Sequence, residues 1–299
     1  MSLCYGAADL YGDSEVLIGK WLAANPDKRK DIFLCSKFGY KIVPGKPHAV
    51  DSTPEYCHQA VEKTLSRLGV PFVDLYYIHR LDLVTPIEKT MRAMVELKNQ
   101  GKIKYIGLSE CSAESLRRAH AVHPITCVQM EYSPFFLGIE SPQYRLLETA
   151  RELGVAIVAF SPLGKGILGG TIRTQEDVKK PGSMRSHLPW FGEETLEKNI
   201  AVVDKITELA QKKGATTAQL TLAWILAQGD DFFAIPGTTK QHRLEENLGA
   251  LGLTLSAEEE KDVRKRAEGV EGLRLPEYGL KFSYADTPPL EESGWIRSP

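Results

Sequence analysis

The sequence predicts an α/β fold in which helices cover a parallel sheet, arranged as a (β/α)8 barrel or as a doubly wound sheet. Short apolar or β-branched runs alternate with longer amphipathic segments along the 299 residues, as in repeated strand–helix pairs. The runs are apolar along nearly their whole length, as expected of strands buried on both faces. Polar residues close several strands and no GxGxxG turn follows any of them, which favours the barrel.

The expected strands and helices follow in chain order. Strands are expected at 31–37, 73–79, 103–109, 125–131, 155–161 and 232–235, and residues 3–8 could supply a seventh. Helices are expected at 53–68, 86–100, 112–123, 143–153, 196–213, 217–228, 245–251 and 257–268, with another after Tyr11. The helix at 53–68 has the clearest signals: Thr53 as N-cap, Pro54 in the first turn and Gly69 as stop.

Composition restricts the class of protein. With 42% hydrophobic and 25% charged residues, we expect one domain over residues 1–299, with a lid loop at 164–194 and a tail at 268–299. A net charge of −2 argues against nucleic acid or a membrane surface as partner. Scattered cysteines, the lack of a leader pattern and the lack of a long apolar run predict a cytoplasmic protein.

Three residues suggest acid–base chemistry. Tyr11 lies between an apolar segment and a helix, and Lys37 and His79 end strands. A phenol with a pKa near ~10 donates its proton readily at neutral pH only when a nearby cation lowers that pKa. Lys37 would be that cation, and His79 would donate a hydrogen bond to a substrate carbonyl. Taken singly, each residue also fits a packed or solvent-reaching side chain.

A second group suggests a nucleotide cofactor. Ser109, Gln129 and Tyr132 end neighbouring strands and suit a planar ring that bears an amide. A Gly/Thr loop after the last strand runs into a helix start with Lys240 and Arg243, a good phosphate site because helix N-termini attract anions. No HxxxH or HExxH spacing occurs, so no metal site is expected.

In combination and in order, these stretches resemble the aldo-keto reductase family, most closely its fungal and plant members with a long loop. They are Ala8–Gly12 with Glu15, Ser36–Gly39, Asp74–Arg80, Gly107–Ser109, Gln129–Ser133, Phe160–Gly164 and Ile235–Asn247. The resemblance spans residues 8 to 251. It implies a (β/α)8 barrel that binds NADPH in an extended form.

The resemblance also implies roles for individual residues. Tyr11 matches the proton donor, Lys37 the residue that lowers its pKa, and His79 the residue that orients the carbonyl. The matching cofactor positions are Ser109 and Gln129 for the carboxamide, Tyr132 for stacking on nicotinamide, Ser161, Leu163 and Gly164 for the pyrophosphate, and Thr238, Arg243, Glu246 and Asn247 for the adenosine end. Arg243 favours the 2′-phosphate and therefore NADPH.

Two features depart from the family pattern. The family has an aspartate five residues before the tyrosine, where this chain has Gly6. The family also carries a first strand and helix before this motif, so the chain resembles an N-terminally truncated member with a missing or incomplete first βα segment. Such a barrel has unpaired edges that strand sliding, residues 3–8, the tail or a second subunit could close. Closure by a second subunit would make the protein a homodimer.

These observations predict an NADPH-dependent reductase for the carbonyl group of a small metabolite. Trp190, Phe191, Tyr284 and Trp295 in the lid and tail suggest an apolar or aromatic substrate. One alternative is a barrel that carries out dehydration, isomerisation or cyclisation in secondary metabolism. Another is a non-catalytic relative that binds NADPH.

Overall fold

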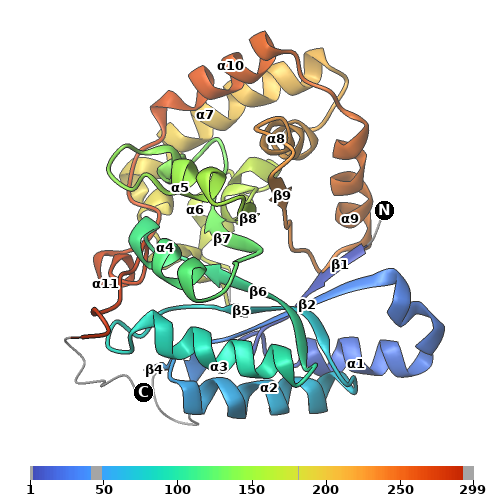
Figure 1. Cartoon of the computed structure of the whole chain (residues 1–299). Coiled ribbons are helices and arrows are strands. Elements are labelled where there is room, and N and C mark those ends of the chain that lie inside the picture. Colours follow the sequence, from blue (N-terminus) through green and yellow to red (C-terminus); the bar gives the residue numbers. More distant parts are fainter. Residues whose placement is uncertain (1–2, 42–48, 181, 292–299) are drawn as a thin grey trace. The chain divides into compact units, whose positions relative to one another are not determined.

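The computed structural model describes residues 3–41, 49–180 and 182–291. The chain divides into two compact units (Figure 1). Unit 1 comprises Met1–Gln129, Glu148–Val155 and Phe282–Pro299, and unit 2 comprises Met130–Leu147 and Ala156–Lys281. Each unit is described by itself. The single domain expected from the sequence stays a prediction.

Unit 1 is built on parallel strands in the order β1-β2-β5-β6-β7. The strands are β1 (Leu3–Gly6), β2 (Ile32–Phe38), β5 (Val73–Ile78), β6 (Ile103–Ser109) and β7 (Cys127–Glu131), of which β7 ends in unit 2. A small hairpin is formed by β3 (Tyr40–Lys41) and β4 (Ala49–Val50). The helices are α1 (Ser14–Ala24), α2 (Pro54–Leu68), α3 (Ile87–Asn99), α4 (Ala113–Val122) and α5 (Leu146–Glu152), of which α5 begins in unit 2. Figure 1 shows α1, α2 and α3 side by side along one side of the strands.

Local signals explain how α2 and α1 form and pack. The Thr53 hydroxyl accepts a hydrogen bond from the Tyr56 amide at 3.2 Å, and Gly69 ends α2 with φ 64°, so both predicted boundaries are confirmed. Helix α1 packs against α2 at Gly19. A Cβ atom on this residue would lie 2.4 Å from the carbonyl oxygen of Arg67, so only glycine allows this close approach.

Unit 2 contains a parallel pair of strands and α7, the longest helix among the described residues. The strands are β8 (Ala156–Phe160) and β9 (Phe232–Ala234). The helices are α6 (Gln175–Val178), α7 (Glu193–Lys212), α8 (Thr217–Leu226), α9 (Gln241–Gly249), α10 (Ala257–Arg266) and α11 (Glu277–Leu280). Capping boxes start α8 at Thr216 and α10 at Ser256, as expected from Gln219 and Glu259 three residues later.

The lid and tail are more structured than expected. The segment 164–194 forms short 3-10 turns at Gly164–Gly169, Met184–His187 and Pro189–Phe191 besides α6. Trp190 and Phe191 are 1% and 2% exposed and therefore belong to the core of unit 2. They and the buried Tyr284 give no direct support to an aromatic substrate, and Trp295 lies outside the described residues. Among the residues that the structure describes, no helix has both the length and the apolar character to cross a membrane.

Candidate active site

Three of the predicted residues come together in unit 1 because they leave neighbouring strands. Tyr11 follows β1, Lys37 lies near the end of β2, and His79 follows β5. The carboxyl ends of parallel strands meet at one edge of a sheet. The ring centroids of Tyr11 and His79 are 5.7 Å apart, and the Lys37 ammonium lies 4.8 Å from the centroid of the Tyr11 ring.

The chain reaches Tyr11 through tight turns. The Tyr11 amide donates to the carbonyl oxygen of Ala8 at 3.1 Å, and the Ser14 amide donates to the carbonyl oxygen of Tyr11 at 3.1 Å. Gly12 between them has φ 60°, which glycine adopts without strain. The turns leave the Tyr11 residue 46% exposed.

Lys37 is a buried cation, with the residue 3% exposed. Its ammonium donates a hydrogen bond to the carbonyl oxygen of Ala7 at 3.2 Å. It also lies over the face of the Tyr11 ring, an attractive cation–π arrangement. The Lys37 ammonium therefore contacts both the backbone that precedes Tyr11 and the Tyr11 ring.

His79 is held as a neutral imidazole. Its ring lies edge-on to Tyr11 and also to Tyr40, whose centroid is 5.0 Å away. Burial, together with the charges of Arg80 and Lys37, lowers the pKa of His79 to about 2. Within the described part of the chain, Nδ1 is buried without a hydrogen-bond partner. A neutral imidazole can still donate one N–H to a carbonyl oxygen.

The pKa of Tyr11 departs from its ordinary value in the direction opposite to the sequence prediction. Burial raises this pKa, Arg80 opposes the rise, and Tyr40 and Asp9 add to it. The phenol is thus protonated at neutral pH and can donate a proton, but it is a weaker acid than a solvated tyrosine. A cation over the ring face does not outweigh desolvation here.

Gly6 occupies the position of the family aspartate, at the end of β1. A Cβ atom built on Gly6 meets no described atom within 4 Å. The next residue, Ala7, supplies the carbonyl oxygen that binds Lys37. The Cβ atom of an aspartate at position 6 would therefore meet no described atom.

Asp9 is a site residue that the sequence did not identify. One carboxylate oxygen accepts hydrogen bonds from the Gly39 amide and the Tyr56 hydroxyl, each at 3.3 Å. Its other oxygen is buried and makes no hydrogen bond to any described residue. Burial raises the pKa of Asp9 to about 6, against the effect of these hydrogen bonds. Tyr56 lies 47 residues away, so no local pattern could show this contact.

We expect Asp9→Asn to reduce the loss of stability between pH 4 and pH 7. The pKa of Asp9 is higher in the folded protein than in the unfolded chain. The carboxyl therefore contributes its full stabilisation of the fold at pH values below its unfolded pKa, and this stabilisation is lost as the pH rises through about 6. The wild-type protein should therefore lose ~1–2 kcal/mol more than the variant over this range, after allowance for solvent screening. Chemical denaturation at pH 4.5, 6 and 7.5 measures the difference, and parallel profiles for the two proteins would contradict the assignment.

Ser109 and Gln129 also lie together in unit 1. They are register partners in the parallel β6–β7 pair and are 2% and 4% exposed. The Ser109 hydroxyl accepts a hydrogen bond from Arg80 at 3.3 Å. Glu110, which follows with φ 54°, donates its amide to the Gln129 carbonyl oxygen at 3.1 Å. Two neutral polar side chains thus lie at the same register on adjacent strands.

The remaining cofactor residues lie in unit 2. In the loop after β8, four residues have a positive φ: Ser161, and then the three consecutive residues Gly164, Lys165 and Gly166. Two guanidinium groups flank it. Arg185 lies 3.2 Å from the Cβ position of Gly166, and Arg243 lies 3.5 Å from that of Gly169. The loop that contains Ser161, Leu163 and Gly164 is therefore a glycine-rich turn beside two cations, and Arg185 was not identified from the sequence.

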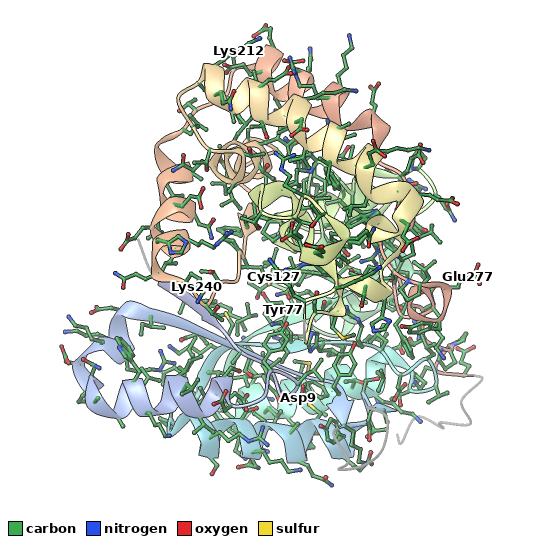
Figure 2. The ribbon with its side chains drawn as sticks, turned by 180° about the vertical axis from the view of Figure 1, so that it is seen from behind. Asp9, Tyr77, Cys127, Lys212, Lys240 and Glu277 are labelled. Carbon is green, nitrogen blue, oxygen red and sulfur yellow. The ribbon has the colours of Figure 1, made fainter. Side chains whose placement is uncertain are left out.

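The polar residues around the start of α9 complete this basic region. The Thr238 hydroxyl accepts a hydrogen bond from the Lys240 amide at 3.0 Å, and Lys240, labelled in Figure 2, is the N-cap residue of α9. Arg243, Glu246 and Asn247 follow on the helix. The carbonyl oxygen of Glu246 accepts a hydrogen bond from Gln219 at 3.1 Å, which ties α9 to α8.

Tyr132 does not fit the expected stacking position. The residue is 0% exposed, and its ring stacks on Trp224 at 5.5 Å and contacts Phe232 at 5.2 Å. Its hydroxyl binds Glu140. No face of the ring is open to a nicotinamide, so the expected stacking role does not fit this side chain. Phe160 ends β8 directly before Ser161 and is only partly buried. Its position at a strand end is the sequence feature that could have identified it as an aromatic residue of the site.

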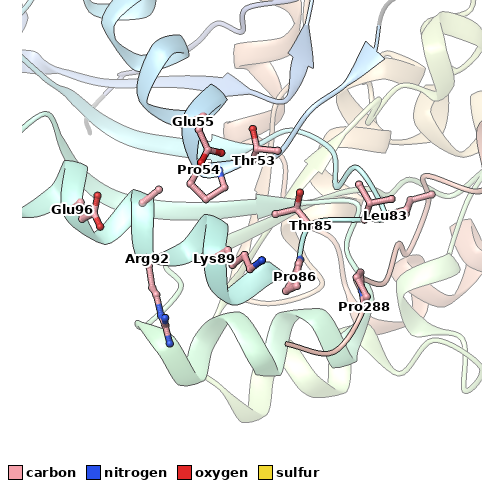
Figure 3. Close-up of a pocket in the computed structure, with 12 residues that line it drawn as sticks. Thr53, Pro54, Glu55, Leu83, Thr85, Pro86, Lys89, Arg92, Glu96 and Pro288 are labelled. Atoms are coloured by element: carbon pink, nitrogen blue, oxygen red, sulfur yellow. The ribbon is translucent and has the colours of Figure 1, made fainter. Parts of the chain in front are cut away.

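A groove of about 750 Å³ lies elsewhere in unit 1, between the starts of α2 and α3 (Figure 3). Glu55, Lys89, Arg92 and Glu96 contribute charges of both signs to its lining. None of the candidate catalytic residues lines this groove. It is therefore distinct from the site at Tyr11.

Comparison with known proteins identifies the family. The model of the Aldo/keto reductase family matches residues 5–268. Aldo-keto reductase str7 of Strobilurus tenacellus is 52% identical over 264 residues, covering 88% of this chain and 76% of that protein. Aldo-keto reductase yakc [NADP(+)] of Schizosaccharomyces pombe is 42% identical over 291 residues, covering 96% and 85%.

Solved structures agree with this assignment. The glycerol dehydrogenase AKR11B4 of Gluconobacter oxydans is 27% identical with a TM-score of 0.80, covering 96% of this chain and 83% of that one. A thermostable aldo-keto reductase solved with the inhibitor epalrestat is 30% identical with a TM-score of 0.67, covering 87% and 81%. The predicted barrel class is confirmed, and the chain belongs to the aldo-keto reductase family.

Proposed function

We propose that the chain reduces the carbonyl group of a small molecule with NADPH and that Tyr11 donates the proton. The proposal rests on the proximity of three side chains. The ring centroids of Tyr11 and His79 are 5.7 Å apart, and the Lys37 ammonium lies 4.8 Å from the centroid of the Tyr11 ring. The name of the S. pombe relative, which includes NADP(+), supports the choice of cofactor.

Bound NADPH would supply a hydride to the carbonyl carbon. Tyr11 then gives its phenolic proton to the carbonyl oxygen, so that carbonyl, hydride and proton together yield the alcohol. The neutral His79 donates its N–H to the same oxygen and orients it. Lys37, over the ring of Tyr11, stabilises the phenolate that remains.

Within each unit, taken by itself, the candidate residues suit one part of NADPH. Ser109 and Gln129 would hold the carboxamide, and Phe160, in place of the buried Tyr132, would stack on the nicotinamide. The loop with Ser161, Leu163 and Gly164 would hold the pyrophosphate, aided by Arg185. Thr238, Lys240, Arg243, Glu246 and Asn247 would hold the adenosine end, where a guanidinium suits the 2′-phosphate.

A second candidate function is also favoured by an observation. In this case the protein would bind NADPH but reduce carbonyl substrates slowly or not at all. Gly6 lacks the family carboxylate, and the pKa of Tyr11 is raised. Both features weaken proton donation without touching the cofactor residues of unit 2. Cofactor binding and turnover therefore need to be measured separately.

The test is a fluorescence titration with NADPH and NADH, followed by NADPH oxidation over a panel of aliphatic and aromatic aldehydes. We expect NADPH to bind more tightly than NADH, and Arg243→Ala to weaken NADPH binding about 10- to 100-fold because a charged hydrogen bond contributes ~1.5–3 kcal/mol. NADH binding should change little. Arg173→Ala is the matched control, since Arg173 is an exposed unit 2 cation that pairs with Asp204. Failure of the wild-type protein to bind either cofactor would overturn the proposal, and binding without turnover would support the second candidate.

A further inference from the structure

The hydroxyl of Tyr56 lies between two acceptors in unit 1. It is 2.9 Å from the backbone carbonyl oxygen of Tyr40 and 3.3 Å from Oδ2 of Asp9. A phenol has one O–H donor. Burial, together with the neighbouring Asp9, raises the pKa of Tyr56, so the hydroxyl keeps its proton at neutral pH. One proton therefore serves two acceptors, and only one of them at a time receives a full hydrogen bond.

The protonation state of Asp9 decides between the two acceptors. An ionised carboxylate only accepts, and a hydrogen bond to a charged acceptor is about twice as strong as one to a neutral carbonyl, so the Tyr56 proton turns to Oδ2. A protonated carboxyl group is itself a donor. It donates to the Tyr56 oxygen, and Tyr56 then donates to the carbonyl oxygen of Tyr40. The shorter distance to Tyr40 matches this second arrangement.

The surroundings of Asp9 place this change near neutral pH. Burial raises its pKa to about 6 against hydrogen bonds from Tyr56 and from the Gly39 and Tyr40 amides, and the charge of Glu15 on α1 adds to the rise. Among the described residues, Oδ1 of Asp9 is buried without a hydrogen-bond partner. A buried acceptor without a partner disfavours the ionised form, because its charge lacks the solvation that water would give.

Cations on the neighbouring elements have other acceptors. The contacts are Arg67 with Glu15 at 3.2 Å, Lys41 with Asp51 at 3.1 Å, Lys37 with the carbonyl oxygen of Ala7 at 3.2 Å, and Arg80 with that of His79 at 2.7 Å. The described residues give Asp9 no ion pair of its own. Its ionised form therefore depends on hydrogen bonds, among which the one from Tyr56 comes from a side chain that has a second acceptor.

Tyr40 connects this pair to the candidate catalytic residues. Its ring lies edge-on to His79, with the two centroids 5.0 Å apart. When Tyr56 donates to Oδ2 of Asp9, the backbone of Tyr40 loses a hydrogen bond, and the ring that packs on His79 is held less firmly. The charge of an ionised Asp9 also adds to the rise that burial causes in the pKa of Tyr11. Both effects lower turnover when Asp9 is ionised.

We propose that Asp9 and Tyr56 form a proton-operated switch that positions Tyr40 against His79 when Asp9 is protonated. Asp9 and Tyr56 are thus positioning residues that act through Tyr40. Their effect on turnover rests on the proposed carbonyl reduction, in which His79 orients the substrate. The exchange of the Tyr56 proton between its two acceptors does not depend on that reaction.

The dependence of kcat on pH between 5 and 7.5 tests the positioning role. The wild-type kcat should fall ~3- to 10-fold with a midpoint near pH 6, within the ~10²-fold loss that a small misplacement can cause. Asp9→Asn keeps a donor and an acceptor at this place, so it should lose the pH dependence and keep the higher rate. Tyr56→Phe should lower kcat at pH 5 to near the wild-type value at pH 7.5. Tyr105→Phe is the matched control, because the contacts of Tyr105 with Phe33 and Lys98 involve its ring.

The carbonyl ¹³C resonance of Tyr40 gives a second readout, which needs no turnover. Tyr40–Lys41 is the one Tyr-Lys pair in the sequence, so carbonyl-labelled tyrosine combined with ¹⁵N-labelled lysine selects this carbonyl. As the pH rises through about 6, the resonance should move upfield in the wild-type protein because the carbonyl loses its hydrogen bond. It should not titrate in Asp9→Asn, and in Tyr56→Phe it should stay upfield at pH 5.

The two readouts separate the switch from the proposed function. A Tyr40 resonance that does not change with pH in the wild-type protein, or one that still titrates in Asp9→Asn, would overturn the switch. A constant kcat in an active wild-type protein, or equal losses in Tyr56→Phe and Tyr105→Phe, would overturn the positioning role. If no aldehyde is reduced but the resonance titrates as expected, the proposed function fails and the switch stands.

Discussion

Replacing Tyr11 by phenylalanine should abolish NADPH-dependent carbonyl reduction while NADPH binding is retained. The variant keeps the ring, so its contacts with Lys37 and His79 persist, and only the donating hydroxyl is lost. Loss of a general acid lowers turnover by about 10²- to 10⁴-fold. The measurement is kcat for the best aldehyde of the panel, beside a fluorescence titration with NADPH.

Tyr40→Phe is the matched control for this prediction. Tyr40 also lies edge-on to His79, at 5.0 Å, and its backbone carbonyl oxygen accepts a hydrogen bond from the Tyr56 hydroxyl. The loss of its hydroxyl should change kcat by less than about threefold, far below the effect of an essential proton donor. If Tyr11→Phe retains wild-type turnover, another group donates the proton; if Tyr40→Phe is equally damaged, the effect reflects the surroundings of His79 and not proton transfer from Tyr11.

The parts of the site that could be predicted from the sequence depend on strand order. Tyr11, Lys37 and His79 were each recognised by their place at or after a strand, and parallel pairing brings such places together. Ser109 and Gln129 were found in the same way and are register partners. The boundaries of α2 were predictable because Thr53 and Gly69 act within a few residues of the chain. The hairpin of β3 and β4 was missed because two-residue strands have no detectable periodicity.

The other properties of the site depend on contacts between distant residues. Tyr132 has the position of a ring at a strand end, but its side chain turns into a core with Trp224 and Phe232. The direction of the Tyr11 pKa shift is set by burial, which outweighs the nearby cation Arg80. A motif specifies which side chains are present near a ligand. It does not specify how much water surrounds them, and the solvation of a phenolate decides its pKa.

Gly6→Asp should raise kcat for carbonyl reduction about tenfold or more, equivalent to at least ~1.4 kcal/mol of barrier lowering. The Cβ position of residue 6 is open and the φ of Gly6 is not positive, so neither the Cβ atom nor the backbone opposes an aspartate there. A carboxylate there stands one residue from the Ala7 carbonyl oxygen that binds Lys37. It should hold the ammonium in one position and so favour a fixed geometry for proton transfer from Tyr11.

Gly6→Asn separates this effect from a simpler one. Any side chain at a strand glycine reduces the entropy of the unfolded chain and stabilises the fold by ~0.4–1 kcal/mol, so both variants should show a similar rise in the free energy of unfolding. Only aspartate adds the charge that attracts Lys37, so only Gly6→Asp should accelerate turnover, and Lys37→Met should cancel the gain. Equal acceleration by asparagine would show that backbone rigidity limits the wild-type enzyme. No acceleration by aspartate would mean that Lys37 is already positioned by its bond to Ala7, and that the raised pKa of Tyr11, not the missing carboxylate, limits proton donation.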